Sequence, residues 1–75
     1  MEPYRDWDQD SGVRAFEIGD GYIDVQFKTG AVYRYTTSSA GPENLAQMKT
    51  LARSGDGLNS FINRIVKKGY SERLR

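Results

Sequence analysis

Two short turns containing glycine divide residues 13–36 into three runs that are rich in β-branched and aromatic side chains. Asp20-Gly21 suits a two-residue type I′ hairpin turn, and Lys28-Thr29-Gly30 suits a three-residue loop closed by a left-handed glycine. Each turn fixes the register of the strands beside it. Both registers place apolar side chains on the same face, so the sequence predicts a three-stranded antiparallel meander.

The predicted registers sort the side chains of the meander onto two faces. The apolar face holds Phe16, Ile18, Ile23, Val25, Phe27, Ala31, Tyr33 and Tyr35, and the opposite face holds Ala15, Glu17, Tyr22, Asp24, Gln26, Val32 and Arg34. On the second face Glu17, Asp24 and Arg34 fall in one cross-strand row. This arrangement favours a row of surface ion pairs over a magnesium site or an acid/base pair of carboxylates.

After residue 40 the spacing of apolar residues changes from that of strands to that of helices. A first helix is expected over residues 42–54, and a second over residues 57–68, between Asp56 as its cap and Gly69 as its stop. Their apolar stripes are Leu45, Met48, Leu51 and Ala52 in the first helix and Leu58, Phe61, Ile62, Ile65 and Val66 in the second. These stripes can be buried against the apolar face of the meander.

The predicted fold is therefore an α+β domain, a three-stranded antiparallel meander with two C-terminal helices packed on one face. A small β-barrel variant is the alternative, and it requires further segments to join the three strands. Residues 1–10 are acidic and lack periodicity, which indicates a flexible tail. Residues 11–75 are expected to form a single domain, since a chain of 75 residues is too short for two cores.

The chain contains neither cysteine nor histidine. Disulfides, thiolate metal sites and nucleophile pairs that depend on histidine are therefore excluded. We expect a protein that is not an enzyme and has no cofactor and no metal. The polar first residues do not resemble a secretory signal, and no run is apolar enough to span a bilayer, so a cytoplasmic location without membrane contact is expected.

Charge is distributed unevenly along the chain. Residues 28–75 carry nine basic groups against three acidic ones, although the net charge of the whole chain is only +1. The candidate contacts to a polyanion such as RNA are Asn63, Arg64, Lys67, Lys68 and Arg73, with Lys49 and Arg53 as helpers. The spacing of residues 63, 64, 67 and 68 places them on one flank of the second helix. A solvated helix face is the alternative interpretation of the same pattern.

The triplet Tyr33-Arg34-Tyr35 has two interpretations. Adjacent tyrosines around a cation can form a platform on which bases stack, provided that the rings are exposed. The predicted register instead places both rings on the face that the helices cover. We therefore expect Tyr33 and Tyr35 to be core residues and Arg34 to point outward.

The order of these motifs resembles that of the KTSC domain, a short module found at the C-terminus of some lysyl-tRNA synthetases and as a stand-alone bacterial protein. The resemblance covers residues 11–74. It depends on Ile23, Val25, Phe27 and Gly30 before Tyr33-Arg34-Tyr35, and on Ser54, Gly55, Phe61, Asn63 and Tyr70 after it. In this family the Tyr-x-Tyr triplet is the central motif, and the company of a tRNA ligase implies an RNA-associated role.

The leading functional hypothesis is thus a small non-catalytic RNA-binding or RNA-associated accessory domain that uses a basic helical surface to bind tRNA or single-stranded RNA. The rival hypothesis is a protein-interaction module that docks a partner on Tyr22 and Val32 of the open sheet face, or on an edge strand.

Overall fold

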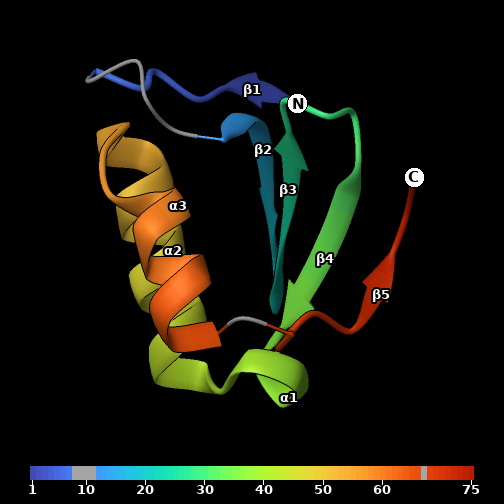
Figure 1. The fold of residues 1–75 in the computed structure, drawn as a ribbon. Coiled ribbons are helices and arrows are strands. Elements are labelled where there is room, and N and C mark those ends of the chain that lie inside the picture. The colour runs from blue at the N-terminus through green and yellow to red at the C-terminus, as the bar shows by residue number, and fades with distance from the viewer. Residues whose placement is uncertain (8–11, 67) are drawn as a thin grey trace.

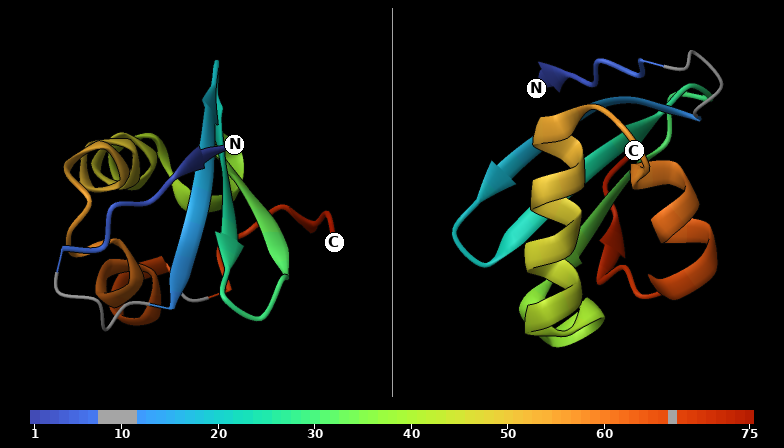
Figure 2. Two further views of the ribbon diagram at one scale, coloured as in Figure 1. Left: turned by 90° about the horizontal axis from the view of Figure 1, so that it is seen from above. Right: turned by 90° about the vertical axis from the view of Figure 1, so that its left-hand side faces the viewer.

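The computed structural model describes residues 1–7, 12–66 and 68–75 of the chain. They form an α+β fold in which a five-stranded antiparallel sheet carries a layer of helices on one face (Figures 1 and 2). The elements are β1 (Glu2–Pro3), β2 (Val13–Gly19), β3 (Tyr22–Phe27), β4 (Val32–Thr36), α1 (Thr37–Ala40), α2 (Pro42–Ser54), α3 (Leu58–Phe61), the π-helical turn η1 (Ile62–Val66) and β5 (Glu72–Arg73).

The central meander β2-β3-β4 has the predicted registers over most of its length. Glu17 lies opposite Asp24, and Asp24 lies opposite Arg34, so the expected cross-strand row is confirmed. At the start of β2 the register shifts between Val13 and Ala15, which places Val13 opposite Phe27. This β-bulge turns Val13, only 1% exposed, into the core.

The sheet has two more strands than the sequence predicts. β1 pairs antiparallel with β2, and β5, which follows the helices in the chain, pairs antiparallel with β4. The strand order β1-β2-β3-β4-β5 describes an open sheet with β1 and β5 at its edges, so the small-barrel alternative is wrong. The prediction of two helices is also too simple, because α1 adds one turn before α2 and the last helical segment consists of α3 and η1.

The core lies between the sheet and the helices. It contains Tyr4, Val13, Phe16, Ile23, Val25, Tyr35, Leu45, Met48, Ala52, Leu58, Ile62 and Val66. Phe16, Ile23, Val25 and Tyr35 come from the face that the turns predicted to be apolar, and Val13 joins them through the β-bulge. The helical residues of the core belong to the predicted stripes. Burial of this contiguous set is the main stabilising term available to a chain without disulfides.

Residues 1–7 contact the rest of the protein, whereas the sequence favours a flexible tail over residues 1–10. Tyr4 is 6% exposed, and its hydroxyl accepts a hydrogen bond from the Leu58 N–H at 3.2 Å. Further along, the Trp7 indole N–H donates to the Ser54 carbonyl at 2.8 Å. The prediction is therefore corrected for residues 1–7, because these side chains satisfy backbone groups at two helix ends. Residues 8–10 lie outside the described part of the chain.

The N-terminal segment packs closely against the end of α2, where the helix stops at a glycine. Gly55 ends the helix with φ of 77°, and its N–H donates to the Leu51 carbonyl at 3.0 Å. A Cβ on Gly55 would lie 2.7 Å from the Cβ of Arg5. Glycine is thus required both by the left-handed backbone and by the approach of the N-terminal segment.

Candidate nucleic-acid interface

Three of the predicted polyanion contacts lie exposed near the end of the helical layer. Asn63 and Arg64 belong to η1, and Lys68 lies two residues beyond its end. Arg64 and Lys68 form no ion pair with any described residue. Their charges are therefore available to a ligand. Lys67, the fourth predicted residue of this flank, lies outside the described residues.

The π-helical turn changes which side chains the helix presents to solvent. Ile62 and Val66 are 4% and 7% exposed, whereas Ile65 is 52% exposed. In an α-helix Ile65 would lie within the predicted apolar stripe. The wider π turn brings Val66 near the line of Ile62 and rotates Ile65 away from the core. The prediction that Ile65 is a core residue is therefore wrong.

An open groove lies beside these exposed residues. Its volume is about 420 Å³, and it is lined by Leu51, Gly57, Ser60, Phe61, Arg64 and Ile65. Leu51 and Phe61 also pack against the core cluster, so their side chains are anchored on the inner side. The groove combines an apolar surface with one guanidinium group and one hydroxyl group. We call it the α2–η1 groove.

The two predicted helper residues differ in their surroundings. The Lys49 ammonium group donates to the Gly19 carbonyl at 3.0 Å and so connects α2 to the β2–β3 turn. This bond gives Lys49 a structural role. Arg53 lies exposed in the last turn of α2, where a positive charge also interacts favourably with the helix dipole.

Arg73 does not join the η1 flank. It belongs to the edge strand β5, opposite Tyr33, and its guanidinium carbon lies 5.7 Å from the centre of the Tyr33 ring. The Arg73 Nε–H also donates to the Arg75 carbonyl at 2.9 Å. The structure thus separates Arg73 from Arg64 and places it on the sheet.

The Tyr33-Arg34-Tyr35 triplet divides between the two faces of β4 as the register predicts. Tyr35 is 2% exposed, and Tyr33 is half-buried against the core. Tyr70 completes an aromatic cluster, with ring-centre distances of 4.6 Å to Tyr33 and 6.3 Å to Tyr35. Burial raises the pKa of Tyr35 to about 12. A ring this deeply buried cannot stack on a base, which argues against the platform.

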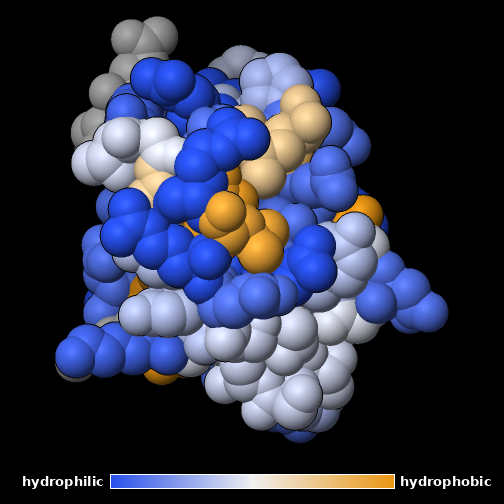
Figure 3. Space-filling view, turned by 90° about the vertical axis from the view of Figure 1, so that its right-hand side faces the viewer, coloured by the Kyte–Doolittle hydropathy of each residue, from blue (hydrophilic) through white to orange (hydrophobic). Residues whose placement is uncertain are grey.

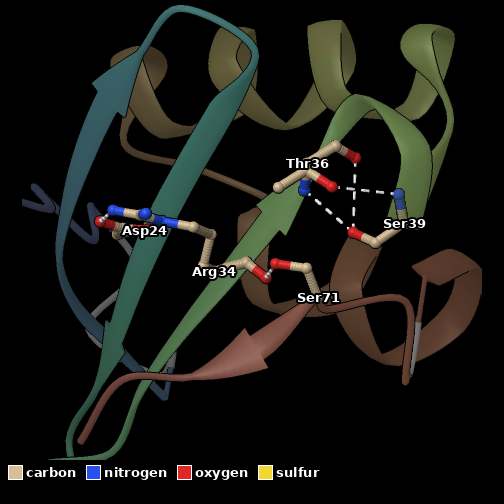
Figure 4. A network of polar contacts seen from close by, with 5 residues as sticks. All are labelled: Asp24, Arg34, Thr36, Ser39 and Ser71. Atoms are coloured by element: carbon tan, nitrogen blue, oxygen red, sulfur yellow. Dashed lines mark hydrogen bonds and ion pairs between the residues drawn. The ribbon is translucent and has the colours of Figure 1, made fainter.

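Arg34 points to the other face of the sheet and is bound there. Its Nε–H and one terminal N–H donate to the two carboxylate oxygens of Asp24 at 2.7 and 2.9 Å (Figure 4). The guanidinium carbon lies 4.3 Å from the centre of the Tyr22 ring. The hydrogen bond to Asp24 holds the pKa of Arg34 above its usual range. Arg34 therefore has a structural role in the sheet.

The open face of the sheet carries a second hollow. It has a volume of about 370 Å³ and is lined by Met1, Gln26, Val32, Leu74 and Arg75. Met1 and Leu74 are 53% and 43% exposed. Figure 3 shows this side of the molecule, where apolar surface is enclosed by hydrophilic side chains. We call this surface the open-face patch.

Among the described residues, no group of three or more His, Cys, Asp or Glu side chains is arranged to hold a metal ion. The described helices include none with the length and apolar character needed to cross a bilayer.

Models of known protein families, curated proteins and solved structures contain no match to this chain.

Sequence reasoning missed the apolar part of the helical surface. It assigned Leu51, Phe61 and Ile65 to the core and predicted only the charged flank. The missing information is the π turn, which is not encoded by the spacing of apolar residues. The open-face patch was anticipated only through Val32, because Met1 and Leu74 lie outside the predicted strands.

Proposed function

We propose that this chain is a small non-catalytic RNA-binding domain, and that the exposed flank formed by Asn63, Arg64 and Lys68 is its contact surface. The observation that carries the proposal is the exposure of two neighbouring cations without an ion pair to any described residue. Phosphate oxygens are suitable partners for both cations, and the Asn63 amide can donate to phosphate or to a base edge.

The charge of the whole helical layer supports the same surface. Residues 37–69 carry five basic side chains against two acidic ones, whereas residues 1–36 carry four basic against seven acidic. A polyanion is therefore attracted to the helices and repelled by much of the sheet. Because few cations are involved, we expect weak binding that depends strongly on salt.

The resemblance of the chain to the KTSC domain also supports an RNA-associated role. Membership of that family and a cytoplasmic location are both part of the proposal. In this view Tyr33-Arg34-Tyr35 maintains the fold, while the helical flank meets the ligand.

The test is a titration of a fluorescent single-stranded RNA with the full chain at several salt concentrations. The double variant Arg64→Gln/Lys68→Gln should weaken binding and reduce the slope of log K against log salt by about 1.4, since each phosphate contact contributes about 0.7 for single strands. The matched control is Arg14→Gln/Arg75→Gln, which removes the same charge outside the helical layer. Millimolar affinity at low salt, or equal losses in both double variants, would contradict the proposal.

A second candidate function is a protein-interaction module, which the open-face patch favours. Met1 and Leu74 there form an exposed apolar surface next to the polar groups of Gln26 and Arg75, whereas Val32, which also lines the hollow, is only 4% exposed. Capture of partners by the immobilised chain, with and without nuclease, separates the two candidates. Partners that survive nuclease and are lost on Leu74→Ser substitution would favour the protein-interaction module over RNA binding.

A further inference from the structure

The α2–η1 groove has the chemistry of a binding site for a flat, apolar group attached to an anion. Leu51, Phe61 and Ile65 supply the apolar surface, and Arg64 supplies a positive charge on the same wall. Ser60 adds a hydroxyl group that can donate or accept. The volume of about 420 Å³ is within the usual range for small-ligand pockets, about 300–1,000 Å³.

The exposure of Ile65 is the unusual feature of this groove. A 52% exposed isoleucine in a helical turn whose Ile62 and Val66 are buried costs stability, because the apolar surface remains in water. The π turn that causes this exposure is a rare arrangement, and such turns occur frequently at functional sites. A ligand that covers the Ile65 side chain would remove its apolar surface from water and so restore the stabilisation that its exposure costs.

Charge complementarity restricts the choice of ligand. Arg64 lines the groove and forms no ion pair with any described residue, so a ligand with negative charge close to its apolar part is favoured. A nucleotide meets this requirement, because each base is a planar apolar group joined through ribose to a phosphate.

We propose that the α2–η1 groove binds one unstacked base of single-stranded RNA, with the base against Phe61 and Ile65 and the adjacent phosphate on Arg64. This inference rests on the proposed function and names its substrate class. In duplex RNA the bases are stacked inside the helix and cannot enter the groove. The domain should therefore prefer single-stranded to double-stranded RNA.

The experiment compares a 12-nucleotide single-stranded RNA and a 12-base-pair RNA duplex as fluorescent ligands. Ile65→Ser should lower the affinity for the single strand about tenfold, as expected for loss of one base contact, and leave the affinity for the duplex unchanged. Arg64→Gln should lower both affinities, because it removes a phosphate contact that both ligands can make. Leu74→Ser is the matched control, an equally polar change at an exposed apolar residue of the open-face patch, and should change neither affinity.

The outcomes separate the two proposals. If Ile65→Ser leaves both affinities unchanged or lowers them equally, the groove proposal is wrong, while a loss on Arg64→Gln still supports RNA binding by the cationic flank. If the wild-type chain binds neither RNA, both proposals fail. Urea unfolding of each variant checks that the fold is retained, which the exposure of Ile65 leads us to expect.

A second measurement detects the base directly. Adenosine 5′-monophosphate should shift the methyl NMR signals of Ile65 and Leu51 upfield, since a stacked aromatic base lies over them, whereas ribose 5-phosphate should not. Equal shifts with both compounds would show that only the phosphate is bound. Shifts at Leu74 instead would place the ligand on the open-face patch, and an acidic peptide that shifts Ile65 where the nucleotide does not would identify a protein ligand. Each of these results would overturn the proposal.

Discussion

Arg34 of β4 binds two other segments of the sheet, one through its side chain and one through its backbone carbonyl. Its guanidinium group binds Asp24 of β3, and its carbonyl accepts hydrogen bonds from the N–H and the hydroxyl of Ser71 at 2.7 and 3.2 Å (Figure 4). Tyr22 covers the guanidinium group. This arrangement provides the buried carboxylate of Asp24, which is only 4% exposed, with a cationic hydrogen-bond partner.

Asp24→Asn should therefore destabilise the protein although it changes the side-chain shape very little. The amide offers one acceptor oxygen in place of two and directs an N–H group toward the guanidinium. We expect the free energy of unfolding to fall by about 1.5–3 kcal/mol, the range for hydrogen bonds to charged groups. Urea denaturation measures the change. Glu17→Gln, in the same row but exposed, is the control, and equal losses in the two variants would contradict a special role for Asp24.

Tyr35 makes stability depend on pH in the alkaline range. Burial raises its pKa to about 12 in the folded state, above the usual value of 10. The folded state thus retains the proton more strongly than the unfolded state, so the stabilisation is complete below pH 10 and is lost as the pH rises toward 12.

Tyr35→Phe removes this ionisation and keeps the ring. The variant should lose less stability than the wild type between pH 10 and pH 11.5, as measured by urea midpoints at successive pH values. All other ionisable groups are the same in the two proteins, so the difference between the two curves reports Tyr35. Parallel curves for the two proteins would show that Tyr35 does not ionise in this range.

At the scale of elements, local signals explain which parts of the fold could be predicted. The turns at Asp20-Gly21 and Lys28-Thr29-Gly30 connect neighbouring strands, so they determined the central registers. α2 was predicted from its proline, its apolar stripe and Gly55. β1 and β5 were missed because each has only two residues, and each pairs with a strand distant in the sequence.

The candidate site was likewise predicted only where local signals in the sequence determine it. Asn63, Arg64 and Lys68 are exposed, as expected for the polar positions of the predicted helix. The groove beside them depends on the π turn and on the packing of α2 against α3, which no pattern in the sequence expresses. The cap of the second helix was also predicted incorrectly. Asp56 was expected at this position, but the residue directly before α3 is Gly57, and the Leu58 N–H donates to the Tyr4 hydroxyl.

Tyr4→Phe tests whether the N-terminal segment stabilises α3. The substitution removes the hydroxyl that accepts from the Leu58 N–H and keeps the buried ring. We expect a loss of about 1 kcal/mol in the free energy of unfolding, as for one buried hydrogen bond, and faster hydrogen exchange at the Leu58 amide. Tyr70→Phe is the control, since this ring is 37% exposed. Unchanged exchange at Leu58 would show that the capping bond contributes nothing.

At the scale of the whole molecule, the two layers carry opposite charge. The helical layer, residues 37–69, has an excess of three basic side chains, and residues 1–36 have an excess of three acidic ones. A strongly anionic ligand is therefore oriented before it makes contact, with the helices toward it and the sheet away from it. This polarity also separates the two candidate surfaces, because the open-face patch lies on the sheet.

A map of amide NMR shifts during titration with single-stranded RNA tests this orientation. We expect the largest changes over residues 58–68 and at the end of α2, and small changes over β2 and β3. Raising the salt concentration to 0.5 M should abolish the shifts, since the attraction is electrostatic and is screened within a few ångströms at that ionic strength. Shifts that concentrate at Val32 and Leu74 and persist in high salt would instead indicate an apolar contact on the open-face patch.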